Sequence, residues 1–293
     1  MSDATFGACV TTRQRPAALE DCLKHLWGGA VRPEAVVVSD DSSEEAAIAK
    51  NKELCAAYPG TQYVTGPRKG VCANRNNAIR GLNTGQYVCF TDDDINVTPS
   101  FFATARKLYA ELPDPEKVIL TGISRTQDGN EIKAVKNEFL GHFALVGPGE
   151  IPTSVNIHAT IFPIEAAKKI HWDENMFFGY EDAEIAMRCV RHGYRLQYSD
   201  QLIADHTHFG TGNYNVADGK LSQVEKHIES ARLYFGLKRY KYLEPNPVKL
   251  AAFSATFFPH LLLYLGKKGA ISVFPEIIQK SAWKKALAAP EFP

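Results

Sequence analysis

Three consecutive carboxylates, Asp92, Asp93 and Asp94, directly follow a run of apolar and β-branched residues. That run, residues 86–91, is typical of a buried strand. Adjacent negative charges repel one another unless a cation neutralises them, and Mg²⁺ or Mn²⁺ prefers carboxylate oxygens together with substrate phosphates. The cluster therefore predicts a divalent-cation site at the end of a strand. The alternative is an acidic turn or a helix cap, since aspartate also favours those positions.

The first hundred residues alternate strand-like and helix-like segments. We expect strands at 6–12, 35–39, 62–65 and 86–91. We expect helices at 16–27 and 70–82, and a further helix that follows the polar cap at 40–43 and ends at residue 58. This order predicts an α/β fold with a largely parallel sheet, whose ligands bind at the carboxyl ends of the strands. Polar residues gather at those ends, namely Thr11 and Arg13, Asp41, and the three aspartates.

The second half of the chain is less regular. Residues 122–153 are typical of loops over one rim of a sheet. We expect further strands at 154–163 and 194–198, and a helix at 180–192 that ends at Gly193. The chain after residue 219 is expected to be helical and basic.

Composition excludes some classes of protein. Lys+Arg and Asp+Glu both number 33, so overall charge gives no reason to expect a nucleic-acid partner. The six cysteines have no CxxC spacing, and several of them, Cys9, Cys89 and Cys189, lie in apparent strands or helices, which indicates buried thiols in a reducing compartment. The first residues lack the basic and apolar regions of a signal peptide, so we expect a cytoplasmic protein.

Four segments together resemble the motifs of one enzyme family. They are VVSDDSS at 37–43, KGVCANRN at 69–76, FTDDD at 90–94, and FFGYEDAE at 177–184. In order and spacing they resemble glycosyltransferase family 2. The resemblance covers about residues 5–210 and implies a GT-A fold, a single Rossmann-like and mostly parallel sheet flanked by helices. It implies a catalytic domain at 1–219, divided into a nucleotide-sugar-binding half, 1–100, and an acceptor-binding half, 101–219.

The resemblance implies roles on the donor side of the site. Thr11 and Arg13 would line the nucleotide, and Asp41 would accept a hydrogen bond from a uracil ring. Arg75 would pair with the diphosphate, which suits a guanidinium group. The alternatives are an N-cap cluster for residues 40–43 and a surface arginine for Arg75.

The aspartates would share the work at the diphosphate. Asp92 would contact the ribose or the metal, and Asp93 would also belong to the donor-binding residues. Asp94 would be the direct ligand of Mn²⁺ or Mg²⁺. The cation would offset the charge that develops on the departing nucleoside diphosphate.

Asp182 would be the general base, because transfer to a hydroxyl requires removal of its proton as the new C–O bond forms. One base opposite the leaving group favours a single displacement with inversion. Glu181 would position the acceptor or cap the helix. The alternative for this acidic segment is a first helical turn whose charges offset the helix dipole.

His206 and His208 follow the last expected strand. Alternate residues of an extended segment point to the same side, so both could reach one metal ion. Related enzymes often place a histidine here, and His206 fits the pattern better than His208.

The C-terminal region, residues 220–293, is expected to be a helical and basic extension. From residue 236 onward it has nine Lys or Arg against three Glu, a local net charge of +6. Residues 250–265 are apolar but shorter than the ~20 residues that a spanning helix needs. Three interpretations remain. Residues 250–285 could lie on the inner face of an anionic membrane, pack on the catalytic domain, or form a homodimer interface.

The leading prediction is a metal-dependent inverting glycosyltransferase that uses a UDP-sugar and a glycan, lipid-linked or small-molecule hydroxyl acceptor. One alternative is a sugar-nucleotide nucleotidyltransferase, although that class would need a glycine-rich phosphate loop after the first strand, and residues 11–16 contain no glycine. Another alternative is a non-catalytic protein that binds nucleotide sugars.

Overall fold

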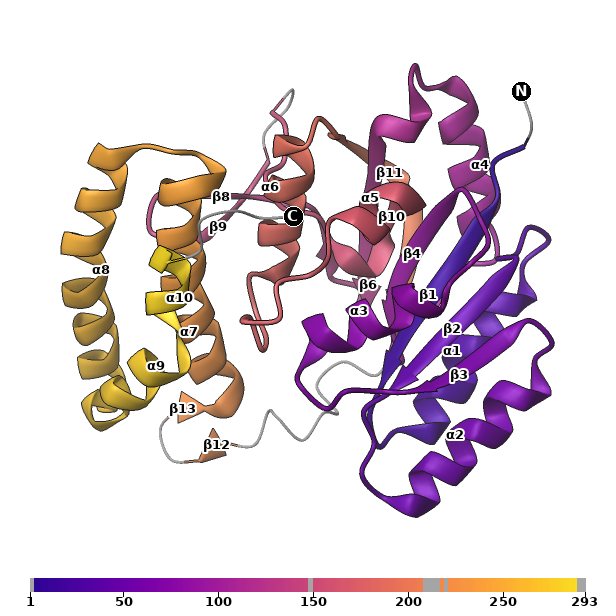
Figure 1. Cartoon of the computed structure of the whole chain (residues 1–293), viewed down its shortest axis with the longest axis horizontal. Coiled ribbons are helices and arrows are strands. Elements are labelled where there is room, and N and C mark those ends of the chain that lie inside the picture. Colours follow the sequence, from indigo (N-terminus) through magenta and orange to yellow (C-terminus); the bar gives the residue numbers. More distant parts are fainter. Residues whose placement is uncertain (1–2, 147–149, 208–216, 219–220, 289–293) are drawn as a thin grey trace.

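The computed structural model describes residues 3–146, 150–207, 217–218 and 221–288. Its main sheet contains β1 (Phe6–Thr12), β2 (Ala35–Asp40), β3 (Thr61–Thr65), β4 (Tyr87–Asp92), β5 (Ile95–Val97), β6 (Val118–Thr126), β7 (Glu131–Ile132), β10 (Thr160–Pro163) and β11 (Arg195–His206). The strand order is β3-β2-β1-β4-β10-β6-β11-β5, and β7 pairs with β6 (Figure 1). Two small hairpins join β8 (Val135–Asn137) to β9 (Phe143–Leu145) and β12 (Ala217–Asp218) to β13 (Leu221–Ser222).

Helices cover both faces of the sheet, and further helices follow after residue 222. They are α1 (Pro16–Gly28), α2 (Glu45–Ala57), α3 (Val71–Gly81), α4 (Phe101–Glu111), α5 (Ile164–Lys169), α6 (Glu181–Arg191), α7 (Gln223–Lys238), α8 (Pro247–Lys268), α9 (Phe274–Lys280) and α10 (Trp283–Ala288). Short 3₁₀ turns, η1 (Pro115–Lys117), η2 (Ile157–Ala159) and η5 (Ile271–Val273), and a π-helical turn, η4 (Arg239–Leu243), complete the described elements.

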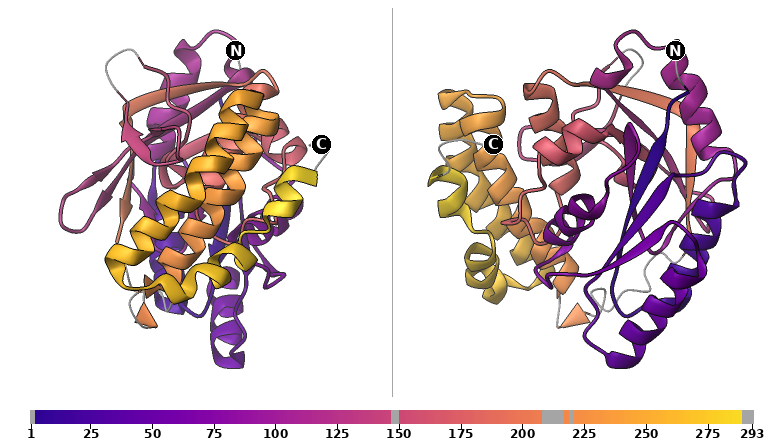
Figure 2. Two further views of the ribbon diagram at one scale, coloured as in Figure 1. Left: turned by 90° about the vertical axis from the view of Figure 1, so that its left-hand side faces the viewer. Right: turned by 45° about the vertical axis from the view of Figure 1, so that its right-hand side comes forward.

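The alternation of strand residues divides the core in two. In β1, Cys9 faces one core, and its neighbours Ala8 and Val10 face the other. The first core is covered by α3, α5 and α6 and continues into α7 and α8, while α1, α2 and α4 cover the second. The helices after residue 222 therefore stand beyond one face of the sheet, as Figures 1 and 2 show.

The GT-A type of fold that the sequence predicted is confirmed, and the first four strands and three helices lie within a residue or two of the expected bounds. β1 to β4 are mutually parallel, whereas β10 and β5 run antiparallel to their neighbours. The expected strand at 154–163 is wrong in its first half, because residues 157–159 form η2 and only Thr160–Pro163 is extended.

The largest difference concerns β11, which we expected to end at residue 198. It continues to His206, with an irregularity in its pairing to β6 between Tyr198 and Ile203. The polar residues at 199–201 resemble a turn in the sequence, but they lie at this bulge and pairing resumes after it. His206 is thus the last residue of a strand, paired with Ile95 of β5, rather than part of a loop.

The apolar segment expected at 250–265 belongs to a longer helix. α8 has 22 residues and contains an 18-residue stretch with a mean hydropathy of 1.4, so it is long and apolar enough to cross a membrane by length and composition. Asn246 caps its first turn by accepting a hydrogen bond from the Lys249 amide at 2.9 Å, and Gly269 ends it in a left-handed conformation. Its buried face carries Phe253, Phe257 and two leucines.

Candidate active site

The carboxyl ends of β1, β2 and β4 place the predicted donor-side residues at one edge of the sheet. Thr11 of β1 is paired in register with Asp92 of β4, and Thr12 with Asp40 of β2. The Thr11 hydroxyl donates to the Asp92 carboxylate at 2.6 Å, and the Thr12 hydroxyl donates to Asp93 at 2.6 Å. Parallel pairing therefore brings together residues 81 positions apart in the chain.

Asp93 is the most enclosed of the three aspartates, with no exposed side-chain surface. Arg15 reaches it from the loop after β1, donating from Nε at 3.2 Å and also from a terminal nitrogen. Burial raises the pKa of Asp93 to about 7 even though Arg15 acts to lower it. Arg15 also donates to Asp94 at 2.9 Å, so one guanidinium group holds both carboxylates.

Asp92 faces the opening of the site, with 23% of its side chain exposed. A terminal nitrogen of Arg75 lies 3.3 Å from its Oδ2, and His158 Nε2 lies 3.6 Å from the same oxygen. Burial acts to raise the pKa of Asp92, but Arg75 and His158 outweigh it and hold the pKa well below its usual range. Asp92 is therefore a carboxylate in this site.

Arg75 joins the two sides of the site. It is 2% exposed, and its other terminal nitrogen lies 3.5 Å from Glu181 Oε1 and 3.6 Å from Asp182 Oδ1. Its guanidinium carbon stands 4.7 Å from the centre of the Trp172 ring. Three carboxylates thus surround one buried cation, which raises the pKa of Arg75 further above its ordinary value despite burial.

The segment that carries Trp172 is held in place by α3. The Asn76 side chain donates to the Trp172 carbonyl at 2.9 Å and accepts from its amide at 2.8 Å. At the start of the same helix, Gly70 has φ +96°, and an added Cβ would lie 2.9 Å from the Phe177 ring. Glycine there lets the helix and the 177 loop approach closely.

Asp41 lies at the end of β2 and is 8% exposed. It accepts the Arg68 amide at 2.7 Å, and burial raises its pKa while Arg68 and the nearby, exposed Arg13 oppose that shift. A Cβ on Gly66 would lie 2.2 Å from the Asp41 carboxylate, so glycine is needed beside it. The neighbouring Asp40 instead accepts three hydrogen bonds, from the Ser42 amide, Asn51 and Tyr63. It therefore links the end of β2 to α2 and β3.

Asp94 and His206 form the part of the site that could hold a metal ion. His206 Nε2 lies 3.6 Å from Asp94 Oδ2, and the His158 ring packs edge-on against the His206 ring at 4.8 Å. Among the described residues, no three Asp, Glu, His or Cys side chains converge into a complete metal site. One carboxylate and one imidazole nevertheless fit Mn²⁺ or Mg²⁺, because these ions usually complete their shells with substrate phosphates and water. His208 lies outside the described residues.

Asp182 and Glu181 begin α6. The residue before them, Tyr180, has φ 63°, a left-handed conformation that is uncommon for a tyrosine, and it follows Gly179 with φ 89°. Asp182 keeps 29% of its side chain exposed. Burial, and then the negative charge of Glu181, raise the pKa of Asp182 above its ordinary value.

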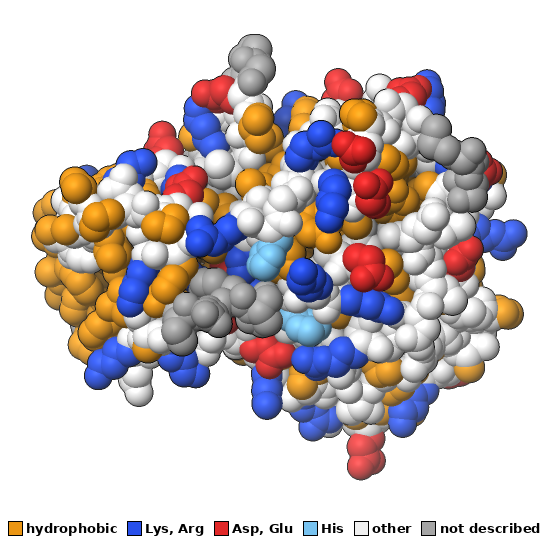
Figure 3. Space-filling model, turned by 45° about the horizontal axis from the view of Figure 1, so that its top comes forward, with side chains coloured by type: hydrophobic (Ala, Val, Ile, Leu, Met, Phe, Trp, Pro, Cys, Tyr) orange, Lys and Arg blue, Asp and Glu red, His pale blue; other side chains and the backbone are white. Residues whose placement is uncertain are grey.

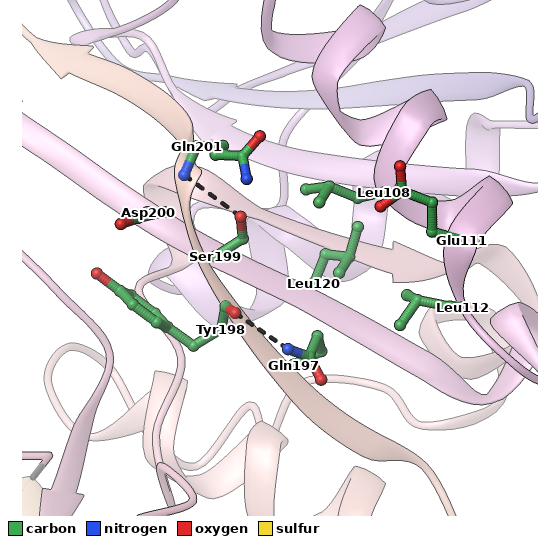
Figure 4. A pocket seen from close by; sticks show the side chains of 9 residues that line it. All are labelled: Leu108, Glu111, Leu112, Leu120, Gln197, Tyr198, Ser199, Asp200 and Gln201. Atoms are coloured by element: carbon green, nitrogen blue, oxygen red, sulfur yellow. Dashed lines mark hydrogen bonds between the residues drawn. The ribbon is translucent and has the colours of Figure 1, made fainter. Parts of the chain in front are cut away.

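A hollow lies elsewhere, between α4 and the bulge of β11 (Figure 4). It has a volume of about 490 Å³, and its charged lining residues, Glu111 and Asp200, are both acidic. Without a basic side chain it would repel a diphosphate, so we do not assign the donor to it.

The structure brings the predicted Thr11, Asp41, Arg75, Asp92, Asp94, Asp182 and His206 to one edge of the sheet. Sequence reasoning missed Arg15, His158 and Trp172. Arg15 was detectable as a second basic residue in the loop after the first strand. His158 is a single histidine in a three-residue turn, and nothing in the local sequence marks it.

Comparison with known proteins identifies the family of this arrangement. A model described as glycosyl transferase family 2 matches residues 8–165. A comparison with curated proteins found no match.

Solved structures share the fold. A crystal structure of GalNAc-T7 with UDP, GalNAc and Mn²⁺ matches 92% of this chain and 59% of that chain, with a TM-score of 0.62 and 13% identity. The mannosyltransferase PcManGT from Pyrobaculum calidifontis, in complex with GDP-Man and Mn²⁺, matches 99% and 86%, with a TM-score of 0.59 and 16% identity. S. aureus TarS 1–349 in complex with UDP-GlcNAc matches 97% and 87%, with a TM-score of 0.58 and 15% identity. The chain thus spans 59% of the length of the GalNAc-T7 chain.

Proposed function

The chain belongs to glycosyltransferase family 2 and is a glycosyltransferase, and from that premise we propose that it transfers a sugar from a UDP-sugar to a hydroxyl acceptor with inversion. The proposal is supported most by Arg75, which touches Asp92 on the donor side and Asp182 on the acceptor side. The buried guanidinium group of Arg75 could therefore bind the departing diphosphate while it stays beside Asp182, the proposed acceptor of the hydroxyl proton.

On the donor side, Asp41 accepts a hydrogen bond from the uracil ring, and Thr11 and Arg13 line the nucleoside. Asp92 accepts from the ribose. Arg75 donates to the diphosphate, for which its planar group is well suited. Asp93 is fully buried and already accepts from Thr12 and Arg15, so it supports the donor site by fixing Arg15 rather than by touching the nucleotide.

Asp94 and His206 would be the protein ligands for Mn²⁺ or Mg²⁺, and His208 is a further candidate. The cation, when bound, supplies positive charge that stabilises the departing diphosphate. Burial acts to raise the pKa of Asp94, but His206 and then Arg15 hold it below its usual range, and Arg15 also orients the carboxylate. The solved neighbours PcManGT and GalNAc-T7 were crystallised with Mn²⁺, which supports the choice of ion.

Asp182 is the general base. As the acceptor oxygen forms its bond to the anomeric carbon, the bond from that carbon to the diphosphate oxygen breaks, and the hydroxyl proton passes to the Asp182 carboxylate. One displacement from the side opposite the leaving group inverts the anomeric configuration. Glu181 raises the proton affinity of Asp182 and positions the acceptor.

The test is a screen of donor hydrolysis with UDP-, GDP- and other nucleotide sugars, each with Mn²⁺, Mg²⁺ or EDTA. We expect one UDP-sugar to be hydrolysed with a divalent cation and not with EDTA. Asp182→Asn should leave the choice of donor unchanged. Turnover of a GDP-sugar alone would contradict the donor assignment, and equal turnover in EDTA would contradict the metal assignment.

A further inference from the structure

The outer face of α8 is apolar and uncovered. Val248, Leu262 and Leu263 are 76%, 41% and 68% exposed. The other exposed residues on the face between them are small or apolar, including Ala251, Ala255, Pro259 and Gly266. One exposed hydroxyl, of Thr256, donates to the Ala252 carbonyl at 2.8 Å and so presents no unsatisfied polar group. Figure 3 shows hydrophobic side chains gathered at the left end of the molecule, where α8 lies.

Charges occur on α8 only at its two ends. Lys249 lies in the first turn, Lys267 and Lys268 lie in the last, and the helix contains no aspartate or glutamate. This pattern, an apolar strip ended by cations, matches the boundary between the acyl chains and the anionic headgroups of a bilayer.

The pattern disfavours a second copy of the chain as the occupant. If two α8 helices packed antiparallel across a two-fold axis, Lys249 would approach Lys267 and Lys268 of the other copy. If they packed parallel, each lysine would approach its own equivalent. Neither arrangement offers an acidic partner on α8, so like charges would meet at both ends of the contact.

The opposite face of α8 is too firmly packed for the helix to leave the protein and span a bilayer. Phe253, Phe257, Leu261 and Leu265 are fully buried. The Arg232 guanidinium of α7 stands 4.7 Å from the centre of the Phe257 ring, and hydrogen bonds run from Tyr264 and Lys268 to Glu225 of α7. A polar and aromatic attachment of this kind keeps the helix on the surface of the domain.

We propose that the outer face of α8 docks this enzyme on an anionic membrane surface, with Leu262 and Leu263 at the acyl boundary and Lys249 and Lys267 at the headgroups. The interaction does not depend on the assignment of donor, metal or base.

The experiment is sedimentation of the full chain with phosphatidylglycerol vesicles and, separately, with phosphatidylcholine vesicles. We expect binding to the anionic vesicles that weakens as salt rises to 1 M, where screening shortens to ~3 Å. Lys249→Gln and Lys267→Gln should each weaken binding by about fivefold, the effect of one basic residue near an anionic surface. Leu262→Ser with Leu263→Ser should abolish it.

The matched control is Lys24→Gln with Lys107→Gln, two exposed lysines on α1 and α4, which should bind vesicles like the unchanged protein. Sedimentation velocity would be measured for every variant. Absence of binding by the unchanged protein would overturn the proposal, and so would equal loss in the control. A dimer that Leu262→Ser with Leu263→Ser converts to a monomer, without vesicle binding, would assign the face to a second copy instead.

Discussion

Arg75 contacts carboxylates on both sides of the candidate site, and its environment explains why an arginine is needed there. Its planar group reaches Asp92 with one nitrogen and the pair Glu181 and Asp182 with the other, while its face lies on Trp172. A lysine would keep the charge but could neither span these partners nor stack in the same way.

Arg75→Lys should therefore weaken UDP binding by about 10–100-fold, the usual cost of losing a charge-assisted hydrogen bond. Turnover should fall further, because Asp182 would also lose the guanidinium group that lies beside it. Arg80→Lys is the matched control, since Arg80 lies on the same helix, is 58% exposed and contacts only Glu174 among the ion pairs described. Calorimetry and turnover of the two variants can be compared directly; equal losses in both would contradict a special role for Arg75.

Asp182→Asn separates binding from chemistry. The substitution keeps the size of the side chain and removes the proton acceptor, so turnover should fall by ~10²–10⁴-fold. UDP affinity should change little, because we propose Asp182 as a residue of the acceptor side. Glu165→Gln, in the first turn of α5 and exposed, serves as the control. Near-full turnover of Asp182→Asn would move the base role to a neighbouring carboxylate, and loss of UDP binding would show that Asp182 is misplaced.

The pH dependence of kcat/KM tests the environment of Asp182, the proposed base. A base acts only when it is deprotonated, and burial together with Glu181 raises the pKa of Asp182 above its ordinary value of 3.8. Activity should therefore rise with pH along an acidic limb shifted well above that value. Glu181→Gln removes one negative neighbour and should move the limb to lower pH. A limb that does not move in this variant would exclude Glu181 as the cause.

At the scale of elements, buried ion pairs join α7 to the first turn of α6, the helix that carries Asp182. The Lys238 ammonium group, fully buried, lies 2.5 Å from Asp173 and 2.5 Å from Glu184 of α6. Tyr234 also donates to Asp173, at 2.7 Å. These contacts lower the pKa of Asp173 to about 2 against the effect of burial, chiefly through Lys238. The helix that carries Asp182 in its first turn is therefore fixed partly by the C-terminal region.

Lys238→Met should destabilise the protein by about 3–5 kcal/mol, because it removes the cation that pairs with the largely buried Asp173 and leaves Glu184 with Arg188 alone. Lys107→Met, an exposed change on α4, should have little effect. Denaturant unfolding of both variants measures the difference. If Lys238→Met were as stable as Lys107→Met, the buried pairs would not hold α7 against α6.

The sequence predicted the elements whose side-chain pattern is local and regular. Strands such as β1 and β4 alternate between two cores, and their polar carboxyl ends mark the site. His158 could not be found in this way, because its role depends on β10 and β11 bringing η2 beside Asp92. The length of β11 was also hidden, since its pairing resumes only after a polar bulge at 199–201. Both features depend on contacts between distant segments.

At the scale of the whole molecule, the C-terminal helices have two different faces. The sequence left packing, membrane contact and dimerisation open for residues 250–285. The structure places one face of α8 in the core beside α7 and leaves the other exposed. A composition of apolar residues and lysines could not reveal this division, because it depends on which side of the helix meets α7.

The measurement that tests the central claim most directly is calorimetric titration of UDP into the unchanged protein and into Asp94→Ala, each with Mn²⁺ and with EDTA. Asp205→Ala is the matched control, because Asp205 adjoins His206 but pairs with Arg125 at the surface. We predict that Mn²⁺ strengthens UDP binding to the unchanged protein and to Asp205→Ala, and that Asp94→Ala loses most of this gain. Equal UDP affinity with and without Mn²⁺ in the unchanged protein would contradict a metal-dependent donor site at Asp94.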